Sequence, residues 1–262
     1  MKLAIFGASG RMGQAVTRLA HEAADVQIVG AIANRDDPAI GRDVGEVAQI
    51  GVVGVEVTSD IGAGLLGADV VIDFSTASAV PELFALCERQ GVAIVSGTTN
   101  LDERGLAALE RAAKKVPVIW APNMSRGVQV LAEVVQHAMR RLGMEFDVEI
   151  VEVHHRKKID SPSGTAVRLA DAAQEVRAEL SQVRGRDGNV GARKPEELGI
   201  FGVRGGDVIG DHTVHLLGDS ERLELTHRAT NRDLFARGAL SAARFTVGHA
   251  PGRYTIADVL GT

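Results

Sequence analysis

Short apolar runs alternate with amphipathic stretches through the first half of the chain. The apolar runs fall at 2–6, 26–32, 69–74, 92–96 and 116–120. Helical periodicity appears at 12–24, 79–90 and 102–115, whereas 38–54 is glycine-rich and indicates a loop with one short turn. Uniformly apolar runs predict strands covered on both faces, and their alternation with helices is typical of a parallel sheet between two helical layers. We therefore expect an α/β fold with a Rossmann-like doubly wound parallel sheet.

The pattern changes after about residue 124. It predicts a long helix, an extended strand and a second helix at 126–142, 145–155 and 164–180. The polar, glycine-bearing segment 182–197 indicates a mobile loop. Three further strands, expected as an antiparallel meander because glycines separate them, lie at 200–204, 207–217 and 221–229. Helix with a short tail returns at 232–262. A second, α+β domain with a mixed or antiparallel sheet is expected at 125–232.

Composition narrows the class of protein. A chain of 262 residues, 45% of them hydrophobic, suffices for two domains with their own cores. The net charge of −5 argues against a nucleic-acid partner. The single cysteine, Cys87, excludes an internal disulfide and a cysteine zinc site, and we expect it buried in a helix. No run reaches the ~18 apolar residues of a membrane span, and Met1–Gly7 is too short for a signal-peptide core. We expect a cytoplasmic protein without a membrane partner.

A glycine turn joins the first strand to the first helix. Its residues are Gly7, Ala8, Ser9, Gly10, Arg11, Met12 and Gly13. Glycines at such a turn let backbone N–H groups approach a pyrophosphate at a helix N-terminus. The spacing is G-x-x-G-x-x-G rather than the strict dinucleotide fingerprint, so a βα turn without a ligand is the alternative. We interpret the turn as a binding site for NAD(P).

The residues after the second strand bear on which dinucleotide binds. An acidic residue there binds the ribose of NAD, but this chain has Asn34 and Arg35. Asn34 does not repel a 2′-phosphate, and Arg35 can pair with one. NADPH or NADH is therefore expected, with dual use or a leaning toward NADPH. An ordinary surface charge is the alternative for Arg35, and Asp36 or Asp37 could instead turn inward.

Later strand ends should face the same crevice, since ligands of open α/β sheets bind beyond the carboxyl ends of the strands. Phe74 follows one strand, and Gly97, Thr98 and Thr99 follow another. The threonine hydroxyls can bind a nicotinamide amide or a substrate, so Thr99 is a candidate for both. The last strand of this half ends at Ala121, Pro122, Asn123 and Met124, which we expect beside the nicotinamide. Plain loops are the alternative.

The strongest chemical signal is a basic tract in an acidic protein. His154, His155, Arg156, Lys157 and Lys158 follow an apolar strand and precede a helix start. The capped start consists of Ser163, Gly164 and Thr165. A helix N-terminus beside cations suits a carboxylate or phosphate, and an imidazolium or ammonium can supply a proton. A solvated surface loop is one alternative. A metal site is another, but a third ligand at suitable spacing is missing, so no metal is expected.

These motifs resemble, in the same order, those of the dihydrodipicolinate reductase family. The tract E-V-H-H-R-K-K-I-D-S-P-S-G-T-A at 152–166 carries most of the likeness, which covers nearly the whole chain. Further shared segments are G-A-S-G-R-M-G at 7–13, D-F-S at 73–75, G-T-T at 97–99, A-P-N-M-S at 121–125, R-G-G-D-V-I-G-D-H-T at 204–213 and L-T-H-R-A at 225–229.

The resemblance implies an NAD(P)H-dependent reductase of a small cyclic dicarboxylate on the way to diaminopimelate and lysine. It implies that His154 is the general acid and Lys158 a second proton donor or charge stabiliser. It implies that His155, Gly164 and Thr165 hold a substrate carboxylate. Residues 1–124, completed by 233–262, would bind the dinucleotide, and 125–232 would bind substrate and build a homotetramer. Asn34 departs from the acidic residue of many members, and Arg232 could sense a substrate carboxylate.

Two other classes remain open from sequence. A dinucleotide sensor without turnover usually carries a basic DNA-binding module, which is not evident here. Another two-domain dehydrogenase, of an amino or semialdehyde acid, is the second. A thioester-forming semialdehyde enzyme needs a positioned cysteine, and Cys87 lies in a predicted helix away from any strand end.

Overall fold

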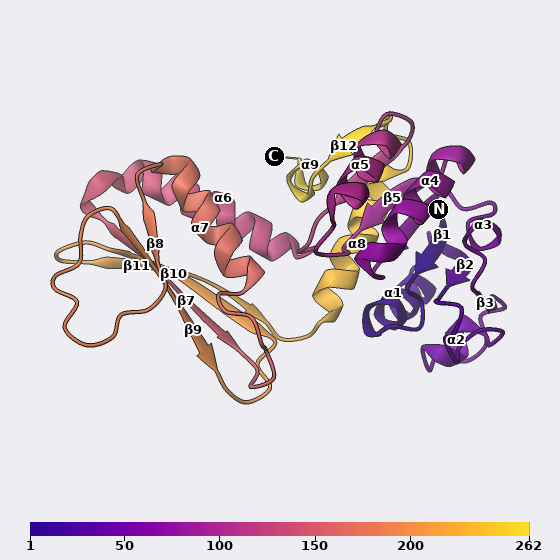
Figure 1. The fold of residues 1–262 in the computed structure, drawn as a ribbon, viewed down its shortest axis with the longest axis horizontal. Coiled ribbons are helices and arrows are strands. Elements are labelled where there is room, and N and C mark those ends of the chain that lie inside the picture. Colours follow the sequence, from indigo (N-terminus) through magenta and orange to yellow (C-terminus); the bar gives the residue numbers. More distant parts are fainter. Residues whose placement is uncertain (262) are drawn as a thin grey trace. The chain divides into compact units, whose positions relative to one another are not determined.

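A computed structural model describes residues 1–261. The chain forms two compact units, Met1–Met124 together with the residues from Asp233 onward, and Ser125–Arg232. Each unit has its own hydrophobic core and its own sheet (Figure 1). Within the described residues no helix has the length and apolarity needed to cross a membrane.

The first unit is built on a parallel sheet. Its strands, in the order in which they pair, are β12 (Gly252–Tyr254), β6 (Pro117–Trp120), β5 (Ala93–Ser96), β4 (Val70–Asp73), β1 (Lys2–Phe6), β2 (Gln27–Ile32) and β3 (Val57–Thr58). Because all the strands are parallel, their carboxyl ends and the loops that follow them lie along one edge. The predicted doubly wound α/β fold is confirmed.

Helices cover both faces of this sheet. One layer packs α1 (Arg11–Glu22) and α8 (Asp233–Thr246) against one set of strand side chains, Leu3 and Ile5 among them. The other packs α4 (Val80–Gln90) and α5 (Glu103–Ala112) against Ala4 and Phe6. Cys87 is fully buried in this second layer, as predicted. Shorter helical elements are α2 (Val44–Val47), α3 (Ile61–Gly64), the 3-10 turn η1 (Ala77–Ala79) and α9 (Ile256–Leu260).

The sequence pattern misses the short elements of the first unit. The predicted single turn within 38–54 is α2, but β3 and α3 after it are not predicted. The C-terminal tail contains β12, which extends the sheet by pairing with β6. Strands of two or three residues are too short to produce a readable alternation of apolar and polar positions.

The second unit has a mixed five-stranded sheet within the described residues. Its strands, in pairing order, are β11 (Arg222–Ala229), β10 (Gly210–Leu217), β7 (Asp147–His154), β9 (Glu197–Arg204) and β8 (Ser181–Val183). The predicted meander is wrong, because β7 lies between β9 and β10 and pairs with β9 in parallel. Only β10 and β11 form the expected antiparallel hairpin. Glycine turns identify the strand ends but carry no information on a partner from earlier in the chain.

Two helices cover one face of this sheet. They are α6 (Arg126–Leu142), which continues into the 3-10 turn η2 (Gly143–Glu145), and α7 (Gly164–Val176), which ends four residues before the predicted end at 180 (Figure 1). On β7, Val148 and Ile150 point into the core beneath these helices. Glu152 and His154 follow on the same face, because side chains two residues apart on a strand share a side. This alternation places two ionisable groups next to each other at one end of the core.

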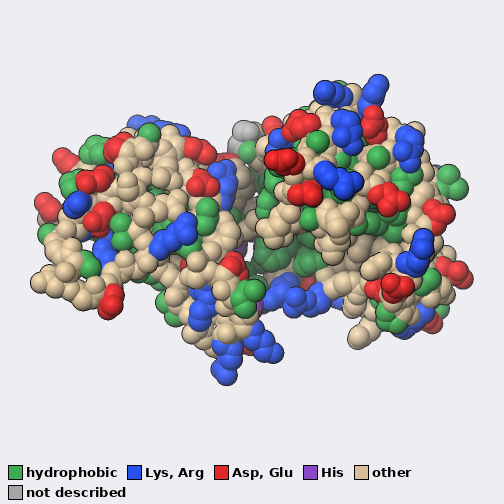
Figure 2. All heavy atoms as spheres, in the orientation of Figure 1, with side chains coloured by type: hydrophobic (Ala, Val, Ile, Leu, Met, Phe, Trp, Pro, Cys, Tyr) green, Lys and Arg blue, Asp and Glu red, His purple; other side chains and the backbone are tan. Residues whose placement is uncertain are grey.

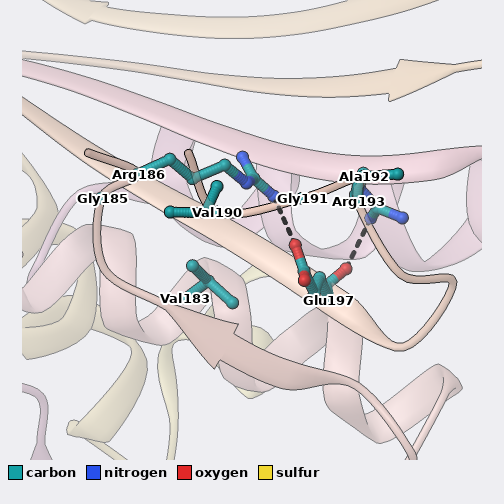
Figure 3. A pocket seen from close by; sticks show the side chains of 8 residues that line it. All are labelled: Val183, Gly185, Arg186, Val190, Gly191, Ala192, Arg193 and Glu197. Atoms are coloured by element: carbon teal, nitrogen blue, oxygen red, sulfur yellow. Dashed lines mark hydrogen bonds and ion pairs between the residues drawn. The ribbon is translucent and has the colours of Figure 1, made fainter. Parts of the chain in front are cut away.

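The segment between β8 and β9 is anchored to the opposite face of the sheet. The sequence predicts a mobile loop over 182–197, yet its ends belong to β8 and β9. Arg186 binds Glu149 and Glu197, while Arg193 binds Glu149 and Asp147. Arg186, Arg193 and Glu197 line a pocket of about 80 Å³, in which they point toward one another (Figure 3). Paired arginines, which a sequence does not reveal, hold the segment in place.

Candidate functional site

The glycine turn of the first unit lies at the carboxyl edge of its sheet. Gly7 follows β1 with φ of 81°, a left-handed conformation that favours glycine. A Cβ on Gly13 would lie 2.2 Å from the Gly7 carbonyl oxygen, so the helix can start this close to the turn only without a side chain. Gly10 is the N-cap of α1 and no side chain caps the helix. The N–H groups of Gly7, Ala8 and Gly10 already donate to backbone carbonyls, so it is the uncapped first turn of α1 that can offer N–H groups to a pyrophosphate.

A buried carboxylate organises the neighbouring strand ends. Asp73, at the end of β4, accepts hydrogen bonds from the hydroxyls of Ser96 and Thr98 at 2.6 and 2.9 Å and from the Ser75 N–H at 2.8 Å. Burial raises the pKa of Asp73, and the hydrogen bonds from Ser75, Ser96 and Thr98 oppose that rise. The carboxylate thus ties the loop after β5 to the loop after β4.

Two close contacts fix the same loop further. The Phe74 ring lies against the backbone of Gly97. A Cβ at position 97 would lie 2.2 Å from this ring, so only glycine leaves room for it. The indole Nε1–H of Trp120, at the end of β6, donates to the Thr98 carbonyl at 2.8 Å. Thr99 next to it is exposed. The loop therefore has a fixed backbone with one exposed hydroxyl at its edge.

The end of β2 has one of the arrangements that the sequence left open. The side chains of Asn34 and Arg35 are exposed. Asp37 turns toward the glycine turn and accepts a hydrogen bond from the Ser9 hydroxyl at 2.6 Å. A carboxylate therefore lies beside the turn despite the absence of an acid at position 34.

Three of the predicted cofactor residues have buried side chains, namely Ala8, Met124 and Thr98, whose hydroxyl binds Asp73. The side chains of Ala8 and Met124 are each 1% exposed and belong to the core of the first unit. Arg11, Met12, Ala121, Pro122 and Asn123 are exposed or half-buried. The structure thus brings the predicted cofactor residues of this unit to one edge, with the side chains of only some of them accessible.

In the second unit, His154 pairs with a carboxylate on its own strand. Its Nδ1 lies 2.5 Å from an Oε of Glu152, and both side chains are almost completely buried. Burial lowers the pKa of His154, the hydrogen bond and charge of Glu152 raise it, and Lys158 and Arg204 lower it again, so that the net direction is downward. Among the described residues Nε2 has no hydrogen-bond partner, which leaves that nitrogen for a ligand.

Glu152 is held from three directions. Arg204, on β9, donates to both of its carboxylate oxygens at 2.8 and 2.7 Å, and the Ser163 N–H donates at 3.1 Å. Burial alone raises the pKa of Glu152, but the hydrogen bonds from Arg204 and His154 outweigh burial and lower it. The carboxylate therefore remains charged at neutral pH.

A second histidine borders this pair. His212, on β10, lies edge-on to His154 with ring centroids 5.1 Å apart. Its Nε2 is 3.0 Å from the Ser163 hydroxyl. Burial lowers the pKa of His212 to about 3, with the charge of His154 adding to the effect, so the ring is neutral. Because His212 stays neutral, His154 is the histidine of this pair that can gain a proton.

Lys158 is also near a carboxylate. Its Nζ donates to both oxygens of Asp160 at 2.8 and 2.7 Å, and the hydrogen bond from Lys158 lowers the pKa of Asp160. Figure 2 shows Lys and Arg side chains gathered at the end of this unit toward which β7 and β9 run in Figure 1. The Lys158 ammonium can bind a ligand's carboxylate in the same way as it binds the Asp160 carboxylate.

The start of α7 completes the cluster. The Ser163 hydroxyl accepts from the Ala166 N–H, which makes Ser163 the predicted N-cap. Gly164 is exposed, and a Cβ there would meet nothing within 4 Å. Ser163 already has protein partners for its hydroxyl and its N–H. Open space at the first residue of a 13-residue helix suits an anion.

His155 lies near Arg232, the last residue of the second unit. The His155 Nε2 is 3.5 Å from a guanidinium nitrogen of Arg232, and the buried Nδ1 of His155 has no hydrogen-bond partner. The two ring nitrogens thus differ, since Nε2 lies near a cation and Nδ1 is buried without a partner, an arrangement compatible with the binding of a polar ligand. Within residues 1–261, no group of three or more His, Cys, Asp or Glu could hold a metal ion.

Sequence reasoning did not assign roles to Glu152, Arg204 and His212, although all three lie in quoted motifs. One signal for Glu152 was available. A carboxylate in the middle of a strand whose alternate positions Val148 and Ile150 are apolar has to be paired, and the residue two positions later is His154. The partner on β9 could not be found, because it depends on the pairing of β7 with β9.

Known proteins resemble the chain over nearly its whole length. Residues 1–124 match the family described as "Dihydrodipicolinate reductase, N-terminus", and residues 127–260 match "Dihydrodipicolinate reductase, C-terminus". A 4-hydroxy-tetrahydrodipicolinate reductase of Anaeromyxobacter dehalogenans is 47% identical, with 99% of this chain and 97% of that protein covered. A reductase of the same name from Myxococcus xanthus is 45% identical, with 100% of this chain and 98% of that protein covered. One from Methanopyrus kandleri is also 45% identical, with 98% of this chain and 95% of that protein covered.

A solved structure shares the fold. The dipicolinate-bound dihydrodipicolinate reductase from Paenisporosarcina sp. TG-14 superimposes with a TM-score of 0.77, covers 97% of each chain and is 24% identical in sequence. An amine dehydrogenase from Mycobacterium smegmatis, at 14% identity, reaches 0.63 over 98% of this chain and 95% of that one. At these identities the likeness concerns the fold alone.

Proposed function

This chain belongs to the dihydrodipicolinate reductase family, and we propose that its two units divide the work between binding a reduced dinucleotide and protonating a cyclic dicarboxylate. The chain is an oxidoreductase that reduces 4-hydroxy-tetrahydrodipicolinate to tetrahydrodipicolinate, with loss of the hydroxyl as water, in the diaminopimelate and lysine pathway. The observation that carries the proposed division is the cluster of His154 and Lys158 beside the open N-terminus of α7. A thioester mechanism is disfavoured because Cys87 is fully buried.

His154 is the general acid in this proposal. When bound, the reduced nicotinamide supplies the hydride. The chain supplies the proton, for which an imidazolium whose Nε2 has no protein partner is suited. Lys158 lies close enough to lower the pKa of His154, and it is the second candidate donor or a stabiliser of developing charge.

Cations and helix amides hold the substrate. Lys158 and the backbone N–H groups of Gly164 and Thr165 offer charge-assisted hydrogen bonds to carboxylates. Ser163 supports this site by capping α7, and His155 offers the ring whose Nδ1 lacks a protein partner. Thr99 of the first unit remains a candidate for either ligand because its hydroxyl is exposed.

The dinucleotide is NADH or NADPH, and we expect use of both with a leaning toward NADPH. Exposed Arg35 offers a guanidinium to a 2′-phosphate, whereas Asp37 beside the turn can accept from ribose hydroxyls. Replacement of Arg35 by Ala should raise the Kd for NADPH about 10-fold, the effect of losing one charge-assisted hydrogen bond, and leave NADH nearly unchanged. Quenching of Trp120, the single tryptophan, reports both values. Equal effects on the two cofactors would remove Arg35 as a phosphate partner.

A homotetramer is proposed through the sheet of the second unit. Its face opposite α6 and α7 carries Val151, Val153 and Phe201, which are half-buried, and Val203, which is 49% exposed. This apolar patch lies between the charged pair Asp211–Arg228 and the Arg186 guanidinium over Phe201, and it is a favourable surface for association. Sedimentation equilibrium should give the mass of four chains, and a monomer at micromolar concentration would contradict the proposal.

A direct assay tests the reductase activity. The cyclic substrate is generated freshly from pyruvate and aspartate semialdehyde, and oxidation of NADH or NADPH is followed by absorbance. Oxidation should require the complete mixture and should yield tetrahydrodipicolinate. Absence of oxidation with both cofactors, in a preparation that binds them, would exclude the reductase assignment.

A further inference from the structure

Glu152 is a fully buried carboxylate to which the proposed chemistry gives no task. It touches His154, Arg204 and Ser163, which belong to three different parts of the second unit. We propose that Glu152 is the positioning residue of the acid: clamped by Arg204 and the Ser163 N–H, it holds Nδ1 of His154 and leaves Nε2 as the nitrogen that exchanges a proton. The proposal rests on the assignment of His154 as the acid, and the experiments below distinguish a failure of that assignment from a failure of the role of Glu152.

The contacts of the Glu152 carboxylate fix the orientation of the His154 ring. Because Arg204 occupies both oxygens and Ser163 one of them, the Glu152 carboxylate cannot turn away from the ring. Two glycines leave room for the side chains of Glu152 and His154. A Cβ on Gly202 would lie 3.1 Å from an Oε of Glu152, and one on Gly210 would lie 2.9 Å from Nε2 of His154. The ring is thus fixed in one orientation, in which its second nitrogen is free of a side chain from β10.

Four ionisable groups face the His154 ring. They are Glu152 on its own strand, Arg204 on β9, His212 on β10 and Lys158 in the loop after β7. Glu152 is the anion of this set, His212 is neutral, and the other two are cations. Burial and both cations disfavour a proton on His154, and Glu152 favours it. Whether the imidazole can carry a proton in this place therefore depends on one carboxylate.

The same carboxylate links the acid to the substrate site. Its Oε1 accepts from the Ser163 N–H, and Ser163 is the N-cap whose next residue, Gly164, begins α7. The distance between Nε2 and the start of the helix is thereby set through Glu152. Loss of the Glu152 charge should lower kcat, because His154 then holds its proton less readily. KM should change less, through the altered contact between residue 152 and the start of α7.

Glu152→Gln tests the charge with little change of shape. We expect kcat to fall about 10- to 100-fold at neutral pH, as for loss of a group that orients a catalytic residue. Activity requires protonated His154, so it declines as pH rises through the pKa of that residue. Since Glu152 raises this pKa, its loss should move the decline to lower pH by about one pH unit. An NMR titration of the His154 ring should show the same direction without any substrate.

Glu149→Gln is the matched control. Glu149 lies on the same strand, is 8% exposed, and also binds arginines, Arg186 and Arg193, but on the opposite face. It should leave the pH profile and the His154 titration unchanged. A uniform loss of activity in Glu152→Gln, with the pH profile and the ring titration as in the wild type, would overturn the proposal.

Arg204→Gln gives a prediction of opposite sign, and it serves if Glu152→Gln does not fold. Arg204 is 22% exposed and lowers the pKa of His154, so its loss should move the decline to higher pH and raise the titration midpoint of the ring. An unchanged or lower midpoint would contradict the proposal. Full activity of a His154 variant would refute the acid assignment, whereas the ring titrations would still report on Glu152.

Discussion

Replacement of His154 by Gln is expected to lower kcat about 100-fold or more, because a general acid contributes 10²–10⁴-fold. Glutamine keeps a polar side chain of similar reach beside Glu152 but carries no proton that can be transferred near neutral pH. The cofactor should bind as before, since the glycine turn belongs to the other compact unit. Steady-state kinetics measure kcat, and quenching of Trp120 measures the cofactor Kd.

A matched control separates this effect from a general loss of stability. His137 is an exposed histidine on α6 of the same unit, and His137→Gln should leave both kinetic constants within twofold of the wild type. Normal turnover in His154→Gln would remove His154 as the acid. In that outcome Lys158, the second cation of the cluster, becomes the candidate donor.

Replacement of Lys158 by Ala is expected to raise KM about 10- to 100-fold, because a hydrogen bond to a charged group contributes about 1.5–3 kcal/mol. The ammonium binds the Asp160 carboxylate bidentately, and a substrate carboxylate can take the same geometry. Binding of a cyclic dicarboxylate such as dipicolinate, followed by calorimetry, should weaken by a similar factor. Turnover at saturation falls as well if the ammonium stabilises developing charge.

Lys157→Ala provides the comparison for Lys158. Lys157 precedes it in the same basic tract and is exposed, whereas the Lys158 side chain is 17% exposed. The change of net charge is identical, so a general effect of the positive surface would appear in both variants. An unchanged KM in Lys158→Ala, or equal increases in the two variants, would argue against a specific carboxylate contact.

Elements with a long regular pattern could be predicted from sequence. The parallel core strands of the first unit are uniformly apolar because both faces are covered, and the helix predicted at 126–142 coincides with α6. The N-cap at Ser163 follows from its position just before a periodic stretch, and the structure has the expected hydrogen bond to Ala166. Local chemistry decides these features, so a local pattern reveals them.

Features that depend on partners distant in the chain could not be predicted. The insertion of β7 between β9 and β10 is decided by packing beneath α6 and α7, and no turn residue records it. The clamp of Arg204 on Glu152 follows from that pairing. In the sequence Asp73 stands out only as part of the D-F-S segment, yet it binds the loop after β5 through Ser96 and Thr98. A single carboxylate in a sequence does not reveal which hydroxyls will reach it.

The central claim is that His154, Lys158 and the start of α7 act together on one dicarboxylate. A crystal structure of the protein with NADP⁺ and dipicolinate tests it most directly. We expect one carboxylate on the Lys158 ammonium and the backbone N–H groups of Gly164 and Thr165. Nε2 of His154 should point toward the dipicolinate ring, and Nδ1 should remain on Glu152. A dicarboxylate bound away from this cluster in every subunit would contradict it.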